Sequence, residues 1–350
     1  MCAVPDEMQH AAAPVLRDFA GQGAVYDGLM RTLRSGSFVH AYLISGLPGM
    51  GKRTLARLMA QYLLCEAEGG DKPCGVCPSC VRVREDSHPD VLIVQPGKPI
   101  SAQVDAGRKT IPVEDIRAVI EITGRHTFEG GRRIVMIQQA DKLTPAAQNA
   151  LLKTLEEPME GTVFLLITDA PELLLPTIVS RCRALKLHPW PDDVVLGALK
   201  ARGVPEDRAG EALRVSGGSI GRAIDTAADE AYWQRRQEVM RDFFAIPDRS
   251  EILKVSTAWR ERKDTSDELL DDIEDMIRTL MLVRLGRLDD SAMAAYPPPW
   301  QRMAGEVDLS AFARLMDAVA DARRLRANQV TWQAVAERLL LSLMEERSKW

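Results

Sequence analysis

Apolar runs and amphipathic stretches alternate along the first half of this 350-residue chain. Short apolar runs predict strands, whereas apolar residues repeated every three to four positions predict helices. Strands are expected at residues 40–45, 91–94, 134–137, 163–167 and 184–187. Helices are expected before the first strand (ending at Gly36), at 52–64, at 112–125 and from Pro145 to Glu157. This alternation predicts an α/β fold with a five-stranded parallel sheet, whose functional site lies at the carboxyl ends of the strands.

The pattern changes at Pro189-Trp190-Pro191. From there to residue 350 the apolar spacing is helical throughout and predicts no strand. The expected helices lie near 192–202, 206–215, 219–229, 231–245, 250–261, 266–286, 308–325 and 330–347. We therefore expect an α/β core over residues 1–188, a small helical segment over 189–240 and a separate helical domain over 241–350.

The turn after the first strand has the form of a phosphate-binding loop. The GxxxxGK part of that motif is met by Gly46, Gly51 and Lys52, with Gly49 inside the loop. Glycines let several backbone N–H groups converge on phosphates at the positive end of a helix. Lys52 adds a positive charge for the outer phosphates. The order of strand, glycine-rich loop and helix therefore predicts that this segment has the form of a nucleotide-binding loop.

The residues that would hold magnesium and activate water are replaced. Arg53 stands where the motif has a Ser or Thr hydroxyl for Mg²⁺, and Thr54 comes one residue late, about 100° around the helix. The third strand leads into Gln138 and Gln139, where a P-loop ATPase has an Asp for Mg²⁺ and a Glu for water. A neutral amide complements Mg²⁺ weakly and takes no proton, and Asp141 is interpreted as a turn or cap residue. We expect no ATP hydrolysis here; whether ATP or ADP is held without hydrolysis is left open.

Four cysteines follow the P-loop helix: Cys65, Cys74, Cys77 and Cys80. Two-residue spacers let one turn present consecutive sulfurs inward, and tetrahedral zinc binds four thiolates at about 2.3 Å. Four ligands leave no open position, so we expect a structural zinc site in an insertion at about 65–88. The alternatives are free or paired thiols and an iron–sulfur cluster. His88 is a spare ligand candidate but is expected to pack in an ordinary loop.

Composition narrows the functional classes. The chain has 45 Lys and Arg against 50 Asp and Glu, a net charge of −5. It has no overall basic field, which disfavours an autonomous zinc-dependent DNA-binding protein. No apolar run reaches the roughly 18 residues of a membrane span, and residues 1–22 lack the apolar centre of a signal peptide. With four of its six cysteines clustered, we expect a cytoplasmic protein with metal-bound cysteines rather than disulfides.

Several motifs together identify a family. They are His40-Ala41-Tyr42, the four-cysteine insertion, the run from Asn149 to Pro158, Thr177-x2-Ser180-Arg181-Cys182, and Gly217-Gly218-Ser219-x2-Arg222. On these residues the chain resembles, over nearly its whole length, the AAA+ clamp-loader subunits of bacterial DNA polymerase III. Because the magnesium and water-activating residues are replaced, it resembles the delta-prime branch rather than the gamma/tau motors. The resemblance implies a P-loop AAA+ core with a zinc insertion, then a helical lid (189–240) and an all-α collar (241–350).

The resemblance also implies roles for single residues. Arg181 matches the arginine that reaches into the ATP site of a neighbouring subunit, where such fingers typically raise the rate by ~10³–10⁵; a surface salt bridge is the alternative. Thr168 matches the position that senses nucleotide in active members. The alternative, in an inactive site, is that Thr168 only caps the strand. Arg222 matches the lid arginine that contacts phosphate, and a structural ion pair is an equal alternative. The four cysteines match the structural zinc insertion of the family.

The function implied is that of a non-hydrolysing stator, within a DNA polymerase holoenzyme, that helps to load the sliding clamp onto primed DNA during replication. The implied partners are the delta and gamma/tau subunits and, through the complex, the clamp and primed DNA, with no membrane. The alternative is a gamma/tau-like ATPase motor with an altered metal site. Arg53, Gln138 and Gln139 speak against that alternative.

Overall fold

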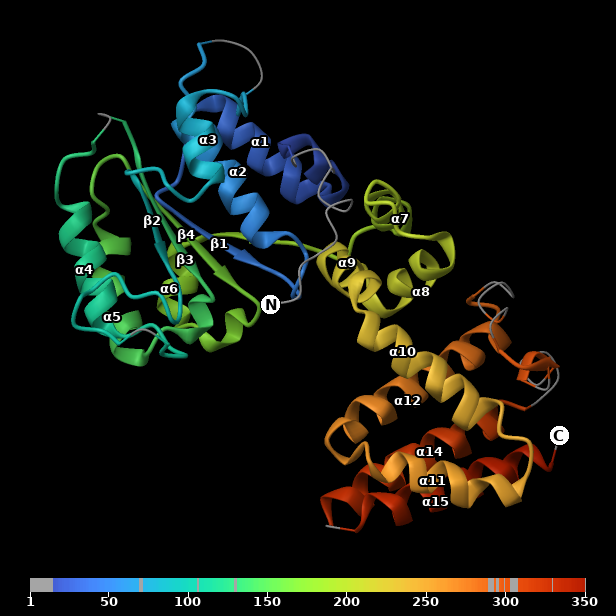
Figure 1. Ribbon diagram of the computed structural model, residues 1–350. Coiled ribbons are helices and arrows are strands. Elements are labelled where there is room, and N and C mark those ends of the chain that lie inside the picture. Colours follow the sequence, from blue (N-terminus) through green and yellow to red (C-terminus); the bar gives the residue numbers. More distant parts are fainter. Residues whose placement is uncertain are drawn as a thin grey trace. The chain divides into compact units, whose positions relative to one another are not determined.

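The computed structural model describes residues 15–68, 72–105, 107–128, 131–288, 293, 296–298, 300–302, 308–328 and 330–349. Contacts divide the chain into two compact units, between Asp225 and Thr226. Each unit is described by itself below (Figure 1). The finer division at residues 188 and 240 stays a prediction.

The first unit is built on a five-stranded sheet. Its strands are β1 (Ala41–Ser45), β2 (Val91–Val94), β3 (Arg133–Gln138), β4 (Thr162–Thr168) and β5 (Arg183–Lys186). All neighbours pair in parallel, in the order β2-β3-β4-β1-β5, which confirms the predicted parallel sheet. Ser45 at the end of β1 is in register with Thr168 at the end of β4, so the loops after these strands start side by side.

Helices cover both faces of this sheet (Figure 1). Ile116, Leu151 and Ile178, from the three helices α4, α5 and α6, pack with sheet residues such as Leu43 and Leu166 in one buried cluster. The P-loop helix α2 packs on the other face. The helices of this unit are α1 (Ala24–Ser35), α2 (Lys52–Leu64), α3 (Pro78–Arg84), α4 (Val113–Thr123), α5 (Pro145–Glu156), α6 (Pro176–Arg181), α7 (Asp192–Lys200), α8 (Glu206–Ser216) and α9 (Ile220–Ala228, which runs across the division).

The second unit is helical around its own core. Its helices are α10 (Glu230–Val239, followed by a π-helical turn, Met240–Phe244), α11 (Ile252–Arg260), α12 (Ser266–Arg284), α14 (Leu309–Ala327) and α15 (Trp332–Arg347). The core is rich in aromatic residues, with Phe243, Trp259, Trp300 and Phe312 fully buried. As predicted, the described residues after Lys186 form no strand. Among the helices that the structure describes, none combines the length and the apolar character needed to cross a membrane.

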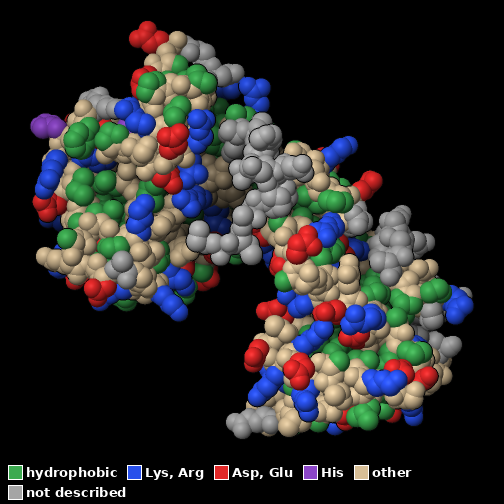
Figure 2. Space-filling model, viewed as in Figure 1, with side chains coloured by type: hydrophobic (Ala, Val, Ile, Leu, Met, Phe, Trp, Pro, Cys, Tyr) green, Lys and Arg blue, Asp and Glu red, His purple; other side chains and the backbone are tan. Residues whose placement is uncertain are grey.

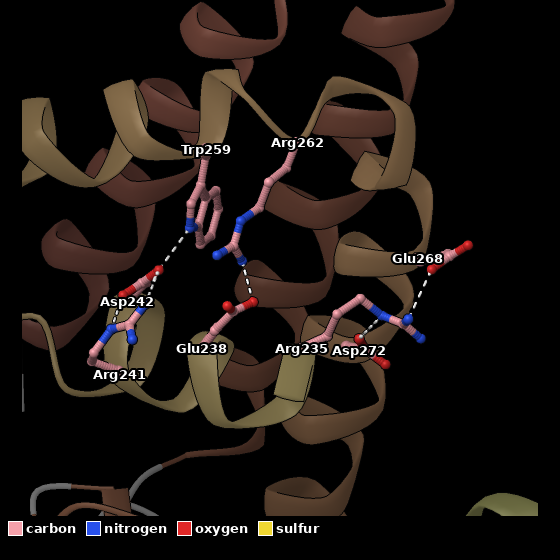
Figure 3. Close-up of polar contacts among 8 residues, drawn as sticks. All are labelled: Arg235, Glu238, Arg241, Asp242, Trp259, Arg262, Glu268 and Asp272. Carbon is pink, nitrogen blue, oxygen red and sulfur yellow. Dashed lines mark hydrogen bonds and ion pairs between the residues drawn. The ribbon is translucent and has the colours of Figure 1, made fainter. Parts of the chain in front are cut away.

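Polar contacts fix α10 within the second unit (Figure 3). Arg235 lies 3.0 Å (Nη1 to Oε2) from Glu268 of α12, and its Nε donates to Oδ2 of Asp272 at 3.3 Å. In the π-helical turn, Oδ2 of Asp242 accepts a hydrogen bond from the indole of Trp259 at 3.1 Å. Burial raises the pKa of Asp272 to about 6, although the charge of Arg235 opposes that effect. Helix α10 is therefore held to α12 by one exposed and one buried carboxylate, and the buried one, Asp272, is sensitive to protonation.

Candidate functional site

The loop between β1 and α2 has the expected strand–loop–helix form. β1 ends at Ser45, α2 begins at Lys52, and Gly46, Gly49 and Gly51 all have positive φ. A side chain at Gly49 would place its Cβ 2.8 Å from the backbone nitrogen of Arg222, so only glycine fits there. The local geometry of a phosphate-binding loop is thus present.

The ammonium of Lys52 is engaged inside this loop. Its Nζ donates to the carbonyls of Gly46 and Leu47, at 2.7 and 2.6 Å, and lies 2.5 Å from Oδ1 of Asp169. Asp169 directly follows β4, next to the end of β1, and the Lys52 side chain is only 7% exposed. An ammonium has three donors, and these three oxygens use them. They are the donors that a phosphate-binding lysine offers to its ligand.

The loop is also covered by the start of α9. The Ser219 hydroxyl donates to the carbonyl of Pro48, and the backbone N–H of Gly221 donates to the carbonyl of Gly49, both at 2.9 Å. Gly49 and Gly221 approach so closely that a Cβ on Gly221 would lie 2.8 Å from Cα of Gly49. Arg222 follows directly, and its exposed side chain extends from this contact point. The lid arginine of the sequence prediction therefore lies next to the loop.

Arg53 has a partner within the chain. Its Nη2 lies 3.1 Å from Oδ2 of Asp86, and Arg57, one turn further along α2, contacts both carboxylate oxygens of Asp86 at 2.8 Å. Asp86 follows helix α3 of the cysteine insertion and has a left-handed backbone, with φ of 54°. The half-buried Thr54 lies beside Arg53 on α2. The guanidinium at the magnesium position is thus tied to the insertion.

The end of β3 carries the two predicted amides. Gln138 is buried, and Gln139 has a left-handed φ of 53° where the chain turns into the short 3₁₀ helix Ala140–Lys142. Asp141 accepts a hydrogen bond from Thr168 (Oγ1 to Oδ1, 2.9 Å), and Thr168 Oγ1 in turn accepts from the N–H of Ala170 at 3.0 Å. Asp141 and Thr168 therefore form a turn-stabilising pair between two strand ends.

The four cysteine sulfurs converge. All lie within 4.8 Å of one another, at Cys65, Cys74, Cys77 and Cys80. Backbone N–H groups of three of these cysteines point at the sulfur of the preceding one, at 3.3 to 3.4 Å. Bonds from the N–H groups of Val76 and Cys77 lower the pKa of Cys74 to about 6, whereas burial raises the pKa of Cys80. Zinc bonds of about 2.3 Å place tetrahedral sulfurs about 3.8 Å apart, so this donor set fits zinc.

His88 lies outside the sulfur cluster and is nearly fully buried. Its Nε2 is 2.9 Å from the hydroxyl of Ser79, and its Nδ1 accepts from the backbone N–H of Asp90 at 3.1 Å. With Nδ1 accepting, neutral His88 donates from Nε2 to Ser79, so this pair does not activate the hydroxyl. As expected, His88 packs in the loop, where it joins the insertion to the segment before β2.

Arg181 ends helix α6 with its side chain 34% exposed. Its Nη2 lies 2.5 Å from Oε1 of Glu156, the last residue of α5, and its Nη1 donates to the carbonyl of Thr177 at 3.0 Å. Two of the five guanidinium N–H donors are thereby used, and three remain. The geometry leaves Arg181 able to bind a further anion at the surface.

Sequence reasoning missed three acidic partners of the predicted basic residues, namely Asp86, Asp169 and Glu156. Asp86 is 33 residues from Arg53, and Glu156 is 25 residues from Arg181. No periodicity links residues so far apart. Only the neighbouring positions of β1 and β4 in the sheet could have suggested Asp169.

Comparisons with a family model and with known proteins all point to subunits of DNA polymerase III. A family model described as "DNA polymerase III, delta subunit" matches residues 21–191. DNA polymerase III subunit delta' of Haemophilus influenzae is 34% identical over 66% of this chain and 68% of that protein. The delta' subunit of Escherichia coli K12 is 38% identical over 63% of this chain, a match that spans 64% of its own length. That of Bacillus subtilis is 27% identical over 91% of this chain and 94% of its own.

Related subunits match less of their own length. DNA polymerase III subunit tau of Escherichia coli K12 is 38% identical over 49% of this chain and 25% of that protein. Among solved structures, the gamma subunit-related protein of Thermotoga maritima aligns with 91% of this chain and 99% of its own, at 17% identity and a TM-score of 0.44. On these sequence relatives, the chain belongs to the delta' subunit family of DNA polymerase III.

Proposed function

We propose that this chain is the non-hydrolysing, fixed subunit of a clamp-loader ring and that it lends Arg181 to the ATP site of a neighbouring motor subunit. The absence of hydrolysis is supported chiefly by Arg53. This residue occupies the position of the Mg²⁺-binding hydroxyl and forms an ion pair with Asp86. A Mg²⁺ ion brought to that place would be repelled by the guanidinium and would find no hydroxyl ligand.

The end of β3 supports the same reading. Activation of water needs a base within hydrogen-bond reach of it. Gln138 and Gln139 are neutral amides. The nearby carboxylate of Asp141 already accepts a hydrogen bond from the Thr168 hydroxyl, and its side chain is only 10% exposed. The chain thus lacks, at this strand end, the ionised pair with which a P-loop ATPase binds metal and activates water.

The contacts of the loop support weak nucleotide binding or none. A nucleotide would have to draw Lys52 away from two carbonyls and from Asp169. Its phosphates would also have to fit beneath the start of α9, which is bonded to Pro48 and Gly49. Each lost contact reduces the net free energy of binding.

Arg181 supports the second half of the proposal. A finger must extend beyond its own subunit, and Arg181 ends a short surface helix with three N–H donors unused. Arginine suits this role because its planar guanidinium binds phosphate oxygens in pairs. In the ring it would stabilise the charge that develops on the γ-phosphate of the neighbour.

The proposed partners are the delta and gamma/tau subunits, with the sliding clamp and primed DNA engaged through the complex in the cytoplasm. The similarity to a tau subunit over half of this chain supports common assembly. Lys and Arg side chains are intermixed with Asp and Glu on the face that Figure 2 shows, which favours DNA contact through the assembly. Zinc held by the four cysteines would be structural, because all four of its ligand positions are filled.

The other candidate is an ATPase motor, which the intact Gly51-Lys52 pair favours. The test is binding and hydrolysis of ATP by the purified chain, with and without Mg²⁺, beside an Arg53→Thr variant. We expect no turnover and weak or no binding by the wild type. Robust magnesium-dependent turnover by the wild type would show that the chain is a motor subunit.

A further inference from the structure

Arg181 is held by α5 at a defined place on the surface. The backbone around it is fixed because Ile178 of α6 is fully buried and Cys182 packs against the same core. The side chain is fixed by two contacts, with Thr177 on its own helix and with Glu156 on the neighbouring one.

A second contact ties the same two helices together. Buried Gln148 of α5 accepts from the N–H of Leu175 at 2.8 Å and donates to the carbonyl of Leu173 at 3.3 Å. Leu175 directly precedes α6, and Leu173 ends the short 3₁₀ turn just before it. The first half of α5 therefore positions the entry of α6, and Glu156 at its end positions the last side chain.

We infer that Glu156 is a positioning residue for Arg181: it orients the guanidinium so that its unused N–H edge is ready for the γ-phosphate of the neighbouring subunit. This inference rests on the proposed function of Arg181. Glu156 itself touches no phosphate. Its contribution is to fix rotamers of a long side chain before the neighbour binds, which spares the entropy of ordering them in the complex.

A carboxylate beside the guanidinium could instead compete with the phosphate for it. The two roles predict opposite effects. If Glu156 positions the arginine, truncation at 156 lowers turnover by the neighbour, and Glu156→Gln rescues it because an amide oxygen still accepts the hydrogen bond. If Glu156 competes, Glu156→Gln raises turnover because it removes the negative charge.

The experiment uses the reconstituted clamp-loader ring, in which only the ATP site next to this chain is active and the other motor sites carry inactivating P-loop substitutions. Turnover is measured at saturating concentrations of this chain and of ATP, so that weaker assembly does not enter. We expect Glu156→Ala to lower kcat about two- to fivefold, the range of a partly exposed ion pair, with KM for ATP unchanged. Glu156→Gln should restore at least half of the loss.

Two comparisons keep the test specific. Glu157→Ala removes the same charge from the exposed next residue and should leave kcat unchanged. Glu156→Ala added to Arg181→Ala should have no further effect, because its action passes through the arginine.

The inference is overturned if Glu156→Ala matches the wild type, if Glu156→Gln raises kcat, or if Glu156→Ala still acts without Arg181. If Arg181→Ala itself leaves turnover unchanged, the proposed function fails instead.

Discussion

Asp86 couples the cysteine insertion to the P-loop helix, and its neutralisation gives a measurable prediction. Both carboxylate oxygens of Asp86 accept hydrogen bonds from Nη2 of Arg57 at 2.8 Å. Oδ2 also accepts one from Nη2 of Arg53 at 3.1 Å. Asn is the matched substitution, since Asn and Asp both tolerate the left-handed backbone seen here, with φ of 54°. Asp86→Asn therefore removes the charge while it keeps the turn.

The magnitude follows from exposure and geometry. The side chains of Arg53, Arg57 and Asp86 are 53%, 27% and 24% exposed, so solvent screens both pairs. Exposed pairs contribute about 0.2–1 kcal/mol each, and the two-oxygen contact of Arg57 lies at the upper end. We expect Asp86→Asn to lower the free energy of unfolding by about 1–2 kcal/mol. Asp86→Ala should cost about 1 kcal/mol more, because alanine disfavours the left-handed turn.

The assay is urea unfolding of the full chain, with amide hydrogen exchange in the first turn of α2 as a local readout. Glu85→Gln is the control, because it removes a charge from the exposed neighbour of Asp86. Faster exchange near Arg53 should accompany the loss in Asp86→Asn. A change below about 0.3 kcal/mol, or one matched by Glu85→Gln, would refute the coupling.

Two further predictions concern the metal and the second unit. Cys80→Ser should abolish stoichiometric zinc, measured by elemental analysis, and lower the melting temperature, whereas Cys182→Ser, outside the sulfur cluster, should retain zinc. Burial raises the pKa of Asp272 in the folded state to about 6, above its ordinary value of 3.8. The folded state therefore binds the proton more tightly than the unfolded state and loses stability as pH rises from about 4 to 6. Asp272→Asn should remove this decline in unfolding free energy, and an unchanged pH profile would contradict it.

The sequence predicted the three inner strands of the sheet well because they are buried and therefore largely apolar. All residues of β1, β3 and β4 are buried. In the second half, apolar spacing located helices within a few residues, as at α8, predicted over 206–215 and observed over Glu206–Ser216. The helix α3 was missed because its seven residues are too few for a periodic pattern and carry a cysteine of the cluster.

The site was predictable only where its parts are local. The residues of the phosphate-binding loop lie close together in the sequence, as do those of the cysteine cluster. Both sets could therefore be named from the sequence alone. The ion pairs of Lys52, Arg53 and Arg181 join distant segments and depend on how helices pack on the sheet. Those pairs decide what the basic residues can still bind, and only the folded chain shows them.

The most direct test of the account compares two variants of this chain in the ring with one active neighbouring site. Lys52→Ala changes the P-loop of this chain, and Arg181→Ala removes the proposed finger. The account predicts that Lys52→Ala leaves ATP turnover within about twofold of the wild type, whereas Arg181→Ala lowers it by ~10³ or more. The opposite pattern, a large loss with Lys52→Ala and none with Arg181→Ala, would contradict it.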